Sequence, residues 1–489
     1  MKKGTIMKKI FTLSMAAVVA FTTVACGGGD KESASTSTVK EENASAEGGF
    51  AKVDPYTNAE VQDLGGYEFT VAANFQYYDD PTGIDLIVSE QEWQSRREEV
   101  EQLYNCKIKV IPVPDNLSSQ ILAGEKVADL VQLDLCDLYN AIGAGYLRPL
   151  DSIEGLDMSD ERWDYNSTYI DLATYKDRPY ALSYAVPSEL RGGIVYNKTL
   201  LKQLGITEDI NQLVENGEWT FDKFLELCQA ATVDANDDGI PESYGVMSQS
   251  GDKFCSDFIN ANGGRMAIMD ESGKVVENFS DQKVVNGLTF ATDLANTYKV
   301  AYIPEAWRTK ATFLAGGYTQ SDFVQEFVNG KAAFYMCETW VMNQLIKPAA
   351  SNIEYGFVPM PKGPDADDYS CDGHYMLGFA VTVNNQDLDK AVVVMNALAE
   401  RAAGYEGNDW IDAALEVQFF QDGDTESVKN YKMLYEKSNF DYIYGIGDLN
   451  ALYNNALQPA VLWNQGSPSS VLSSMRGSMQ NYLDNIYNK

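Results

Sequence analysis

One loop of the sequence carries oxygen-bearing groups at the spacing of a calcium site. Between residues 234 and 242, oxygen ligands fall at loop positions 1, 3, 5 and 9, glycine stands at position 6, and a backbone carbonyl is offered at position 7. The contributing residues are Asp234, Asn236, Asp238, Ile240 and Glu242. Position 12, where an EF-hand has a bidentate glutamate, is Gly245. The loop is therefore either a structural calcium site or a solvated Asx-rich turn, and no other cofactor is required.

The chain contains a single histidine, His374, which limits the catalysis that it can perform. A Ser-His-Asp or Cys-His arrangement would have to use that one residue, and a multi-histidine metal site is excluded. Glycosidase chemistry with two carboxylates needs no histidine and stays open. The cysteines after Cys26 are irregularly spaced without a C-x-x-C pair, so we expect small core residues, although disulfides remain an alternative.

The N-terminus has the order of a bacterial export signal. Lysines precede an apolar run from Ile10 to Val24, which is shorter than the ~20 residues of a membrane-spanning helix. The small residue before Cys26 and the polar tract after it resemble a lipobox, although Thr23 stands where leucine is commonest. We therefore expect a lipoprotein signal peptide at 1–25 and acylation of Cys26. The protein would be extracytoplasmic and held to the outer face of the bacterial cell membrane by lipid alone.

Length and composition indicate a globular protein of two domains. The chain has 489 residues and is 45% hydrophobic, whereas single cores stop growing beyond about 250–300 residues. The formal net charge of −34 argues against a nucleic-acid partner. Residues 26–60 are rich in Ser, Thr, Glu, Ala and Gly and predict a flexible tether.

The first folded segments alternate between strand and helix patterns. Strand patterns are centred on 67–73, 107–113 and 127–134, and a helix is expected at 89–104. Such alternation predicts an α/β fold with a parallel sheet. Ligands of these sheets bind beyond the carboxyl ends of the strands.

Several segments in order resemble the extracellular solute-binding proteins of ABC importers (family 1, maltose-binding-protein-like). Tyr196-Asn197-Lys198 is the most specific match, and Thr220 is a plausible helix N-cap in another. The matching segments are 127–150, 175–182, 194–201, 218–224, 327–334 and 355–363. The resemblance implies a two-lobe periplasmic-binding-protein-like fold of type II, with a ligand cleft at the hinge between the lobes.

The resemblance also implies discontinuous lobes. Lobe 1 would take 61–185 and about 300–400. Lobe 2 would take about 186–299 and part of 400–489.

Candidate ligand-binding residues follow from the same resemblance. Trp340 matches a sugar-stacking position with Glu338 beside it, and Asp134 and Asp137 stand where the family places hydroxyl-binding groups. The other candidates lie in loops or at the crossing between lobes: Phe75, Tyr77, Tyr184, Glu189, Arg191, Asp252, Trp307, His374 and Tyr444. A Tyr or Trp is more often a core or surface packing residue than a ligand contact, and His374 is expected to be only a polar residue near the sheet of the second lobe.

The resulting hypothesis is a non-enzymatic binding component that captures a carbohydrate, an oligosaccharide, by hinge closure. Its partners would be ABC permease subunits with a cytoplasmic ATPase, and the protein would be a monomer. The alternatives are the same fold binding a peptide or a polyamine, and a surface glycosidase.

Overall fold

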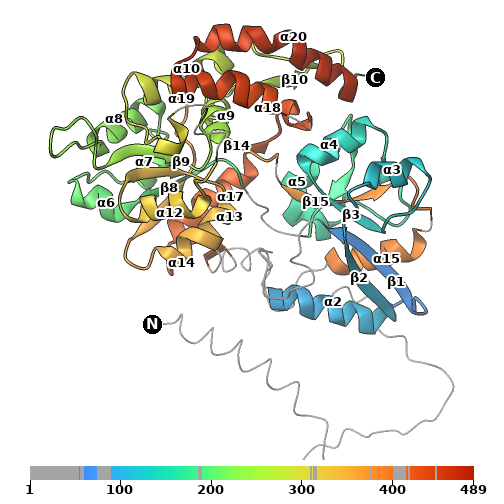
Figure 1. Ribbon diagram of the computed structural model, residues 1–489. Coiled ribbons are helices and arrows are strands. Elements are labelled where there is room, and N and C mark those ends of the chain that lie inside the picture. Colours follow the sequence, from blue (N-terminus) through green and yellow to red (C-terminus); the bar gives the residue numbers. More distant parts are fainter. Residues whose placement is uncertain are drawn as a thin grey trace, which may run out of the picture. The chain divides into compact units, whose positions relative to one another are not determined.

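The computed structural model describes residues 54, 60–73, 90–184, 190–308, 311, 316–374, 376–386, 388–399, 415–416, 419–446 and 449–488 (Figure 1). Its strands are β1 (Tyr67–Ala73), β2 (Cys106–Pro112), β3 (Leu130–Asp134), β4 (Leu147–Arg148), β5 (Thr174–Tyr175), β6 (Arg178–Pro179), β7 (Ala181–Leu182), β8 (Ile194–Asn197), β9 (Tyr244–Ser248), β10 (Ala267–Met269), β11 (Val275–Glu277), β12 (Ala332–Met336), β13 (Tyr355–Val358), β14 (Cys371–Asp372), β15 (Leu377–Thr382) and β16 (Ser438–Asn439).

The α-helices are α2 (Glu90–Tyr104), α3 (Leu117–Leu122), α4 (Leu135–Gly143), α5 (Ser167–Leu172), α6 (Lys198–Gln203), α7 (Ile210–Glu215), α8 (Phe221–Ala231), α9 (Gly251–Ala261), α10 (Gln282–Asn296), α12 (Gln320–Val328), α13 (Thr339–Val341), α14 (Lys347–Ala349), α15 (Asp389–Ala399), α17 (Thr425–Glu436), α18 (Asn450–Leu452), α19 (Gln458–Trp463) and α20 (Pro468–Tyr487). The 3-10 and π turns are η2 (Leu150–Ser152), η3 (Glu161–Asn166), η4 (Glu305–Trp307), η5 (Met342–Ile346), η6 (Tyr442–Gly445) and η7 (Tyr453–Leu457). Among the described residues, no helix combines the length and the apolar character needed to cross a membrane.

The first sheet has the order β2-β1-β3-β15-β4, with β7 also paired to β15. Strand β1 runs parallel to β2 and β3, whereas β15 runs antiparallel to β3, β4 and β7. Alternate residues of β1 share a face, so Phe69 and Val71 pack with residues of α2 and α15 in one core, while Ala72 faces the core that includes α4. The predicted α/β class and the predicted first strands are confirmed.

The second sheet has the order β13-β8-β12-β9. Strand β12 runs parallel to β9 and antiparallel to β8. Every residue of β8, β12 and β13 is buried. Helices α6, α7, α8, α12 and α17 pack against strands of this sheet. Thr220 accepts a hydrogen bond from the Lys223 backbone N–H and caps α8, as the sequence predicted.

The strand pairing corrects one predicted boundary. The segment from about 300 was expected to return to lobe 1, but β12 and β13 pair within the second sheet. Among the described residues after 300, only β15 pairs with the first sheet, and α15 follows it. Local sequence patterns identify a strand, but they do not say which sheet it joins.

Candidate functional site

The register of the second sheet brings three chain segments to one edge. Ile194 at the start of β8 pairs with Met336 at the end of β12, and Met336 also pairs with Ser248 at the end of β9. The segment before β8 and the segments after β9 and β12 therefore lie at the same edge. They carry Arg191, Gln249 and Glu338. Backbone and side-chain hydrogen bonds between Leu190 and Thr339, at 3.3 and 3.1 Å, hold the same segments together.

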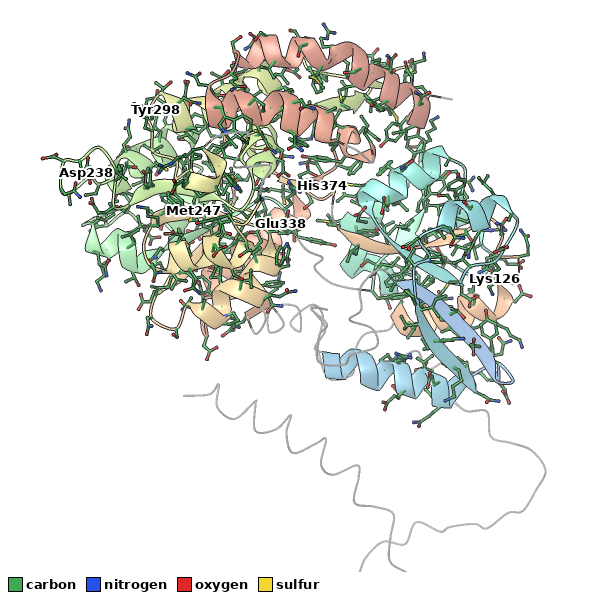
Figure 2. The ribbon with its side chains drawn as sticks, in the orientation of Figure 1. Lys126, Asp238, Met247, Tyr298, Glu338 and His374 are labelled. Atoms are coloured by element: carbon green, nitrogen blue, oxygen red, sulfur yellow. The ribbon has the colours of Figure 1, made fainter. Side chains whose placement is uncertain are left out.

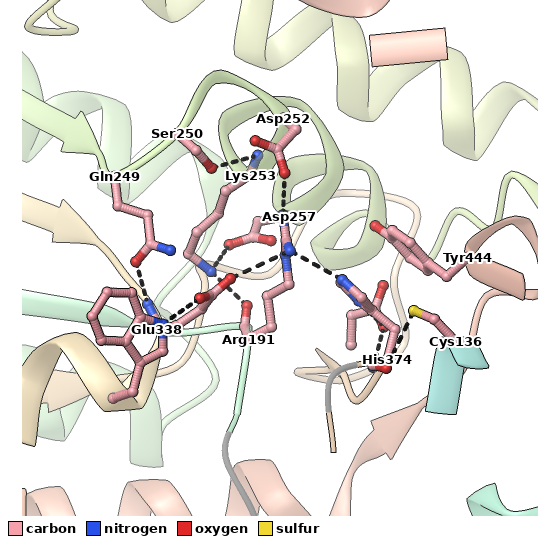
Figure 3. Close-up of polar contacts among 12 residues, drawn as sticks. Cys136, Arg191, Gln249, Ser250, Asp252, Lys253, Asp257, Glu338, His374 and Tyr444 are labelled. Atoms are coloured by element: carbon pink, nitrogen blue, oxygen red, sulfur yellow. Dashed lines mark hydrogen bonds and ion pairs between the residues drawn. The ribbon is translucent and has the colours of Figure 1, made fainter. Parts of the chain in front are cut away.

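Arg191 is the centre of a polar network at this edge (Figure 3). Its side chain is only 4% exposed. One guanidinium nitrogen donates to Asp252, near the start of α9. The other, Nη1, lies 3.3 Å from Glu338 Oε1 and 3.0 Å from His374 Nε2. A buried guanidinium requires such charge-assisted partners, so Arg191 fixes the positions of three side chains from different segments.

The contacts of His374 determine its protonation state. Arg191 can only donate, so His374 Nε2 must accept, and the ring proton of a neutral imidazole lies on Nδ1. Nδ1 faces Asp372 Oδ1 at 2.8 Å. Burial lowers the pKa of His374, and Arg191 lowers it too, against the opposing effect of Asp372. The ring also stacks on Tyr444, with centroids 3.7 Å apart. His374 is therefore a neutral, fixed hydrogen-bonding residue.

Trp340 lies beside this network and is partly exposed. Its indole Nε1 donates to Glu338 Oε2 at 2.6 Å. Burial raises the pKa of Glu338, but Arg191, Lys253 and the hydrogen bonds from Trp340 and Gln249 together bring it below its usual value. Burial likewise raises the pKa of Asp252, and the charge of Arg191 together with hydrogen bonds brings it below its usual value. The site therefore combines an aromatic ring with carboxylates that remain ionised at neutral pH.

A fully buried ion pair lies behind the network. Lys253 Nζ is 2.5 Å from Asp257 Oδ2 and donates to the Arg191 carbonyl at 2.6 Å. Burial raises the pKa of Asp257 to about 6, although Lys253 acts in the opposite direction. This pair ties α9 to the backbone that carries Arg191.

The N-terminus of α4 contacts the segment that carries His374. The Cys136 backbone N–H and thiol donate to the His374 carbonyl at 3.2 and 3.3 Å. Asp134 caps α4 by accepting from the Asp137 backbone N–H at 2.7 Å. Burial raises the pKa of Asp134 to about 6 and also raises that of Asp137. These predicted residues lie at the carboxyl end of β3, within two residues of the contact with His374.

A sequence model of the bacterial extracellular solute-binding proteins matches residues 89–405. The chain belongs to this family. Members bind solutes and are not enzymes, as the sequence predicted. No curated protein matches the sequence.

Solved structures show that this solute-binding protein has the expected periplasmic-binding-protein-type fold. One is an ABC substrate-binding protein from Listeria monocytogenes in complex with cycloalternan, with a TM-score of 0.56 and 16% identity over 85% of this chain and 98% of that chain. A cyclo/maltodextrin-binding protein complexed with maltotetraose has a TM-score of 0.58 and 15% identity, and the match covers 86% of this chain and 98% of that chain. A solute-binding protein from Agrobacterium radiobacter K84 in complex with ribitol has a TM-score of 0.55 and 17% identity, and the match covers 86% of this chain and 100% of that chain.

The predicted site residues of the solute-binding protein divide into four groups. Asp134 and Asp137, at the start of α4, form one of them. One network contains those brought together: Arg191, Asp252, Glu338, Trp340, His374 and Tyr444. Two others pack elsewhere. Tyr184 is a core residue whose hydroxyl donates to the Met395 carbonyl, and Trp307 packs on Phe323. Phe75, Tyr77, Glu189 and Cys26 lie outside the described residues.

Sequence reasoning missed the residues that support this network. Gln249, Lys253 and Asp257 follow β9 within ten residues, and Asp372 stands two residues before His374. The position of the first three, shortly after the carboxyl end of a strand, could have identified them from the sequence. Polar residues at such strand ends are ligand-site candidates. Only Asp252 was selected there. The burial of Lys253 and Asp257 had no local signal.

The acidic loop after α8 has the hydrogen bonds of an Asx-rich turn. Asp234 accepts from the backbone N–H groups of Asp238 and Gly239, and Glu242 accepts from that of Ala235. Figure 2 shows Asp238 on the outside of the molecule. In the described part of the chain, no three His, Cys, Asp or Glu side chains are grouped to hold a metal ion. Calcium binding by Asp234, Asn236, Asp238, Ile240 and Glu242 stays a prediction.

Proposed function

We propose that this solute-binding protein is the substrate-binding component of an ABC importer and that its solute is a carbohydrate, specifically an oligosaccharide. The carrying observation is the Arg191-centred network, which places Trp340 next to ionised carboxylates. Sugar recognition needs a flat apolar surface against the pyranose ring and strong acceptors for its hydroxyl groups. Asp252 supplies one acceptor, and Asp134 and Asp137 add two more at the carboxyl end of β3.

The structural neighbours support a polyhydroxylated ligand. The three described above were solved with cycloalternan, maltotetraose and ribitol. These ligands differ in size but share dense hydroxyl groups. Their proteins are only 15–17% identical to this chain, so they support the ligand class and do not identify the sugar.

A thermal-shift screen tests the proposal. The protein is heated with mono- and oligosaccharides, peptides and polyamines, because a ligand that binds only the folded state adds about 2.7 kcal/mol at 100 times its Kd. One glycan class should raise the Tm. A shift with peptides or polyamines alone would retain the family and reject the carbohydrate assignment.

Trp340→Ala should weaken binding of the glycan found in that screen by about tenfold or more, since it removes the aromatic face. Calorimetric titration measures the change. The matched control is Tyr298→Ala, which removes an exposed aromatic ring (Figure 2) and should leave the Kd unchanged. Equal Kd values for wild type and Trp340→Ala would exclude Trp340 from the binding site.

We further propose that Cys26 carries the lipid that anchors the protein, which then delivers its solute as a monomer to permease subunits with a cytoplasmic ATPase. The export-signal order of residues 1–25 supports this. Cys26→Ser should move the protein from the detergent phase to the aqueous phase in a partition experiment, because acyl chains provide the membrane affinity. Unchanged partitioning would reject the anchor.

A further inference from the structure

We propose that Glu338 is a positioning residue that fixes the orientation of the Trp340 indole, rather than a group that the ligand contacts directly. This inference rests on the proposed function only for its binding test. Its first test needs no ligand.

Both carboxylate oxygens of Glu338 are engaged by protein groups. Oε2 accepts from Trp340 Nε1 at 2.6 Å, and Oε1 lies 3.3 Å from Arg191 Nη1. The Glu338 backbone N–H donates to Gln249 Oε1 at 2.7 Å. The Glu338 side chain is 12% exposed, so little of it reaches a ligand. Its contacts instead connect Trp340 to the second sheet.

The residues that hold Glu338 are themselves fixed. Gln249 donates its backbone N–H to the Met336 carbonyl at 3.0 Å, and its own carbonyl accepts from Gln320 Nε2 at 3.1 Å. Arg191 is held by Asp252 and His374, and its carbonyl by Lys253. Glu338 is therefore a rigid acceptor, set by the ends of β9 and β12.

Trp340 depends on this acceptor because packing does not enclose its side chain. It lies in the first turn of a helical segment that continues from α13 through η5 into α14. The indole is partly exposed, so packing alone does not enclose the ring. A charge-assisted hydrogen bond to Nε1 selects one rotamer and so fixes which ring face is presented. Burial raises the pKa of Glu338, but Arg191, Lys253 and the hydrogen bonds from Trp340 and Gln249 together lower it, which keeps the acceptor ionised.

Fluorine NMR of protein labelled with 5-fluorotryptophan tests the orientation without ligand. Loss of a signal in Trp340→Phe assigns the Trp340 resonance among those of the seven tryptophans. Glu338→Ala should shift and broaden that resonance, because the indole then samples several rotamers. The control, Glu226→Ala, removes an exposed carboxylate from α8 and should leave it unchanged. A sharp, unshifted Trp340 signal in Glu338→Ala would overturn the proposal.

A double-mutant cycle then separates positioning from direct contact. Glu338→Ala should weaken binding of the glycan found in the screen by about tenfold. In a Trp340→Phe background, which keeps an aromatic face but has no Nε1–H, the same change should have little further effect. An equal tenfold loss in both backgrounds would show direct contact and reject the positioning role. If Glu338→Ala does not fold, Glu338→Leu, which also has no acceptor for Trp340 Nε1, replaces it in both tests.

If no saccharide binds, the carbohydrate proposal fails while the NMR result still decides the role of Glu338. If a saccharide binds and the Trp340 resonance is the same in Glu338→Ala as in the wild type, only the positioning role fails.

Discussion

At the residue scale, the stability of the site depends on the buried pair Lys253–Asp257. Lys253→Met should destabilise the protein by about 3–5 kcal/mol at pH 8, because it leaves the Asp257 carboxylate buried without its partner. Burial already raises the pKa of Asp257 to about 6, and loss of Lys253 raises it further. At pH 5 the carboxyl group is protonated, so the loss should be smaller.

Urea denaturation at the two pH values measures this loss. The control is Lys223→Met, which breaks the pair with Glu226 on the surface of α8 and should change the free energy of unfolding by less than about 0.5 kcal/mol. Equal losses for the two variants would contradict the assigned role of the buried pair.

The same residues mark the limit of prediction from sequence. Arg191, Glu338 and Trp340 were predicted through their place in family-like segments, and the structure gathers them. Lys253 and Asp257 were not predicted, because a charged pair at spacing i, i+4 on a helix is ordinarily exposed to solvent. Whether it is buried depends on what covers α9, which is a long-range property.

At the element scale, the packing of α4 against the C-terminal helix α20 depends on a missing side chain. A Cβ on Gly143 would lie 2.3 Å from the Ile486 carbonyl oxygen, a backbone atom that cannot move alone. Nearby, Tyr139 of α4 stacks on Phe440 with centroids 4.3 Å apart and meets Tyr487 of α20 edge-on. Close approach of these elements therefore requires glycine at position 143.

Gly143→Ala should destabilise the protein by about 1–3 kcal/mol, because the added methyl group forces α20 away from α4. Gly477→Ala is the control within α20 itself. A Cβ there meets nothing within 4 Å, so it should stabilise by up to about 1 kcal/mol through helix propensity. Thermal denaturation compares the two, and a stable Gly143→Ala variant would show that the contact is not needed.

Element positions were predictable from sequence to different degrees. The alternation in β1 and the cap at Thr220 are local features, and both were correct. The sheet joined by β12 and β13 was predicted wrongly, because strand partners are chosen by pairing with segments more than a hundred residues away. The contact of α20 with α4 had no sequence signal for the same reason.

At the scale of the whole molecule, stability should respond to pH through two kinds of buried group. As the pH falls, one kind stabilises the folded state and the other destabilises it. Burial raises the pKa values of Asp134, Asp257 and Asp441 to about 6, so each favours the folded state more as the pH falls through that value toward the unfolded-state pKa of about 3.9. His374 acts in the opposite direction. Burial, together with Arg191, lowers its pKa in the folded protein below the reference value of 6.5, so the unfolded chain binds the proton more readily.

Stability from a neutral His374 is therefore present above pH 6.5 and is lost as the pH falls below it toward the folded-state pKa. The free energy of unfolding of wild type, minus that of His374→Gln, should decrease from pH 7 to pH 5. Contributions that the two proteins share, including those of the three aspartates, cancel in this difference. His374 is the only histidine of the chain, so no other imidazole contributes. Urea denaturation across this range measures the difference, and a constant value would show that protonating His374 does not disrupt its contact with Arg191.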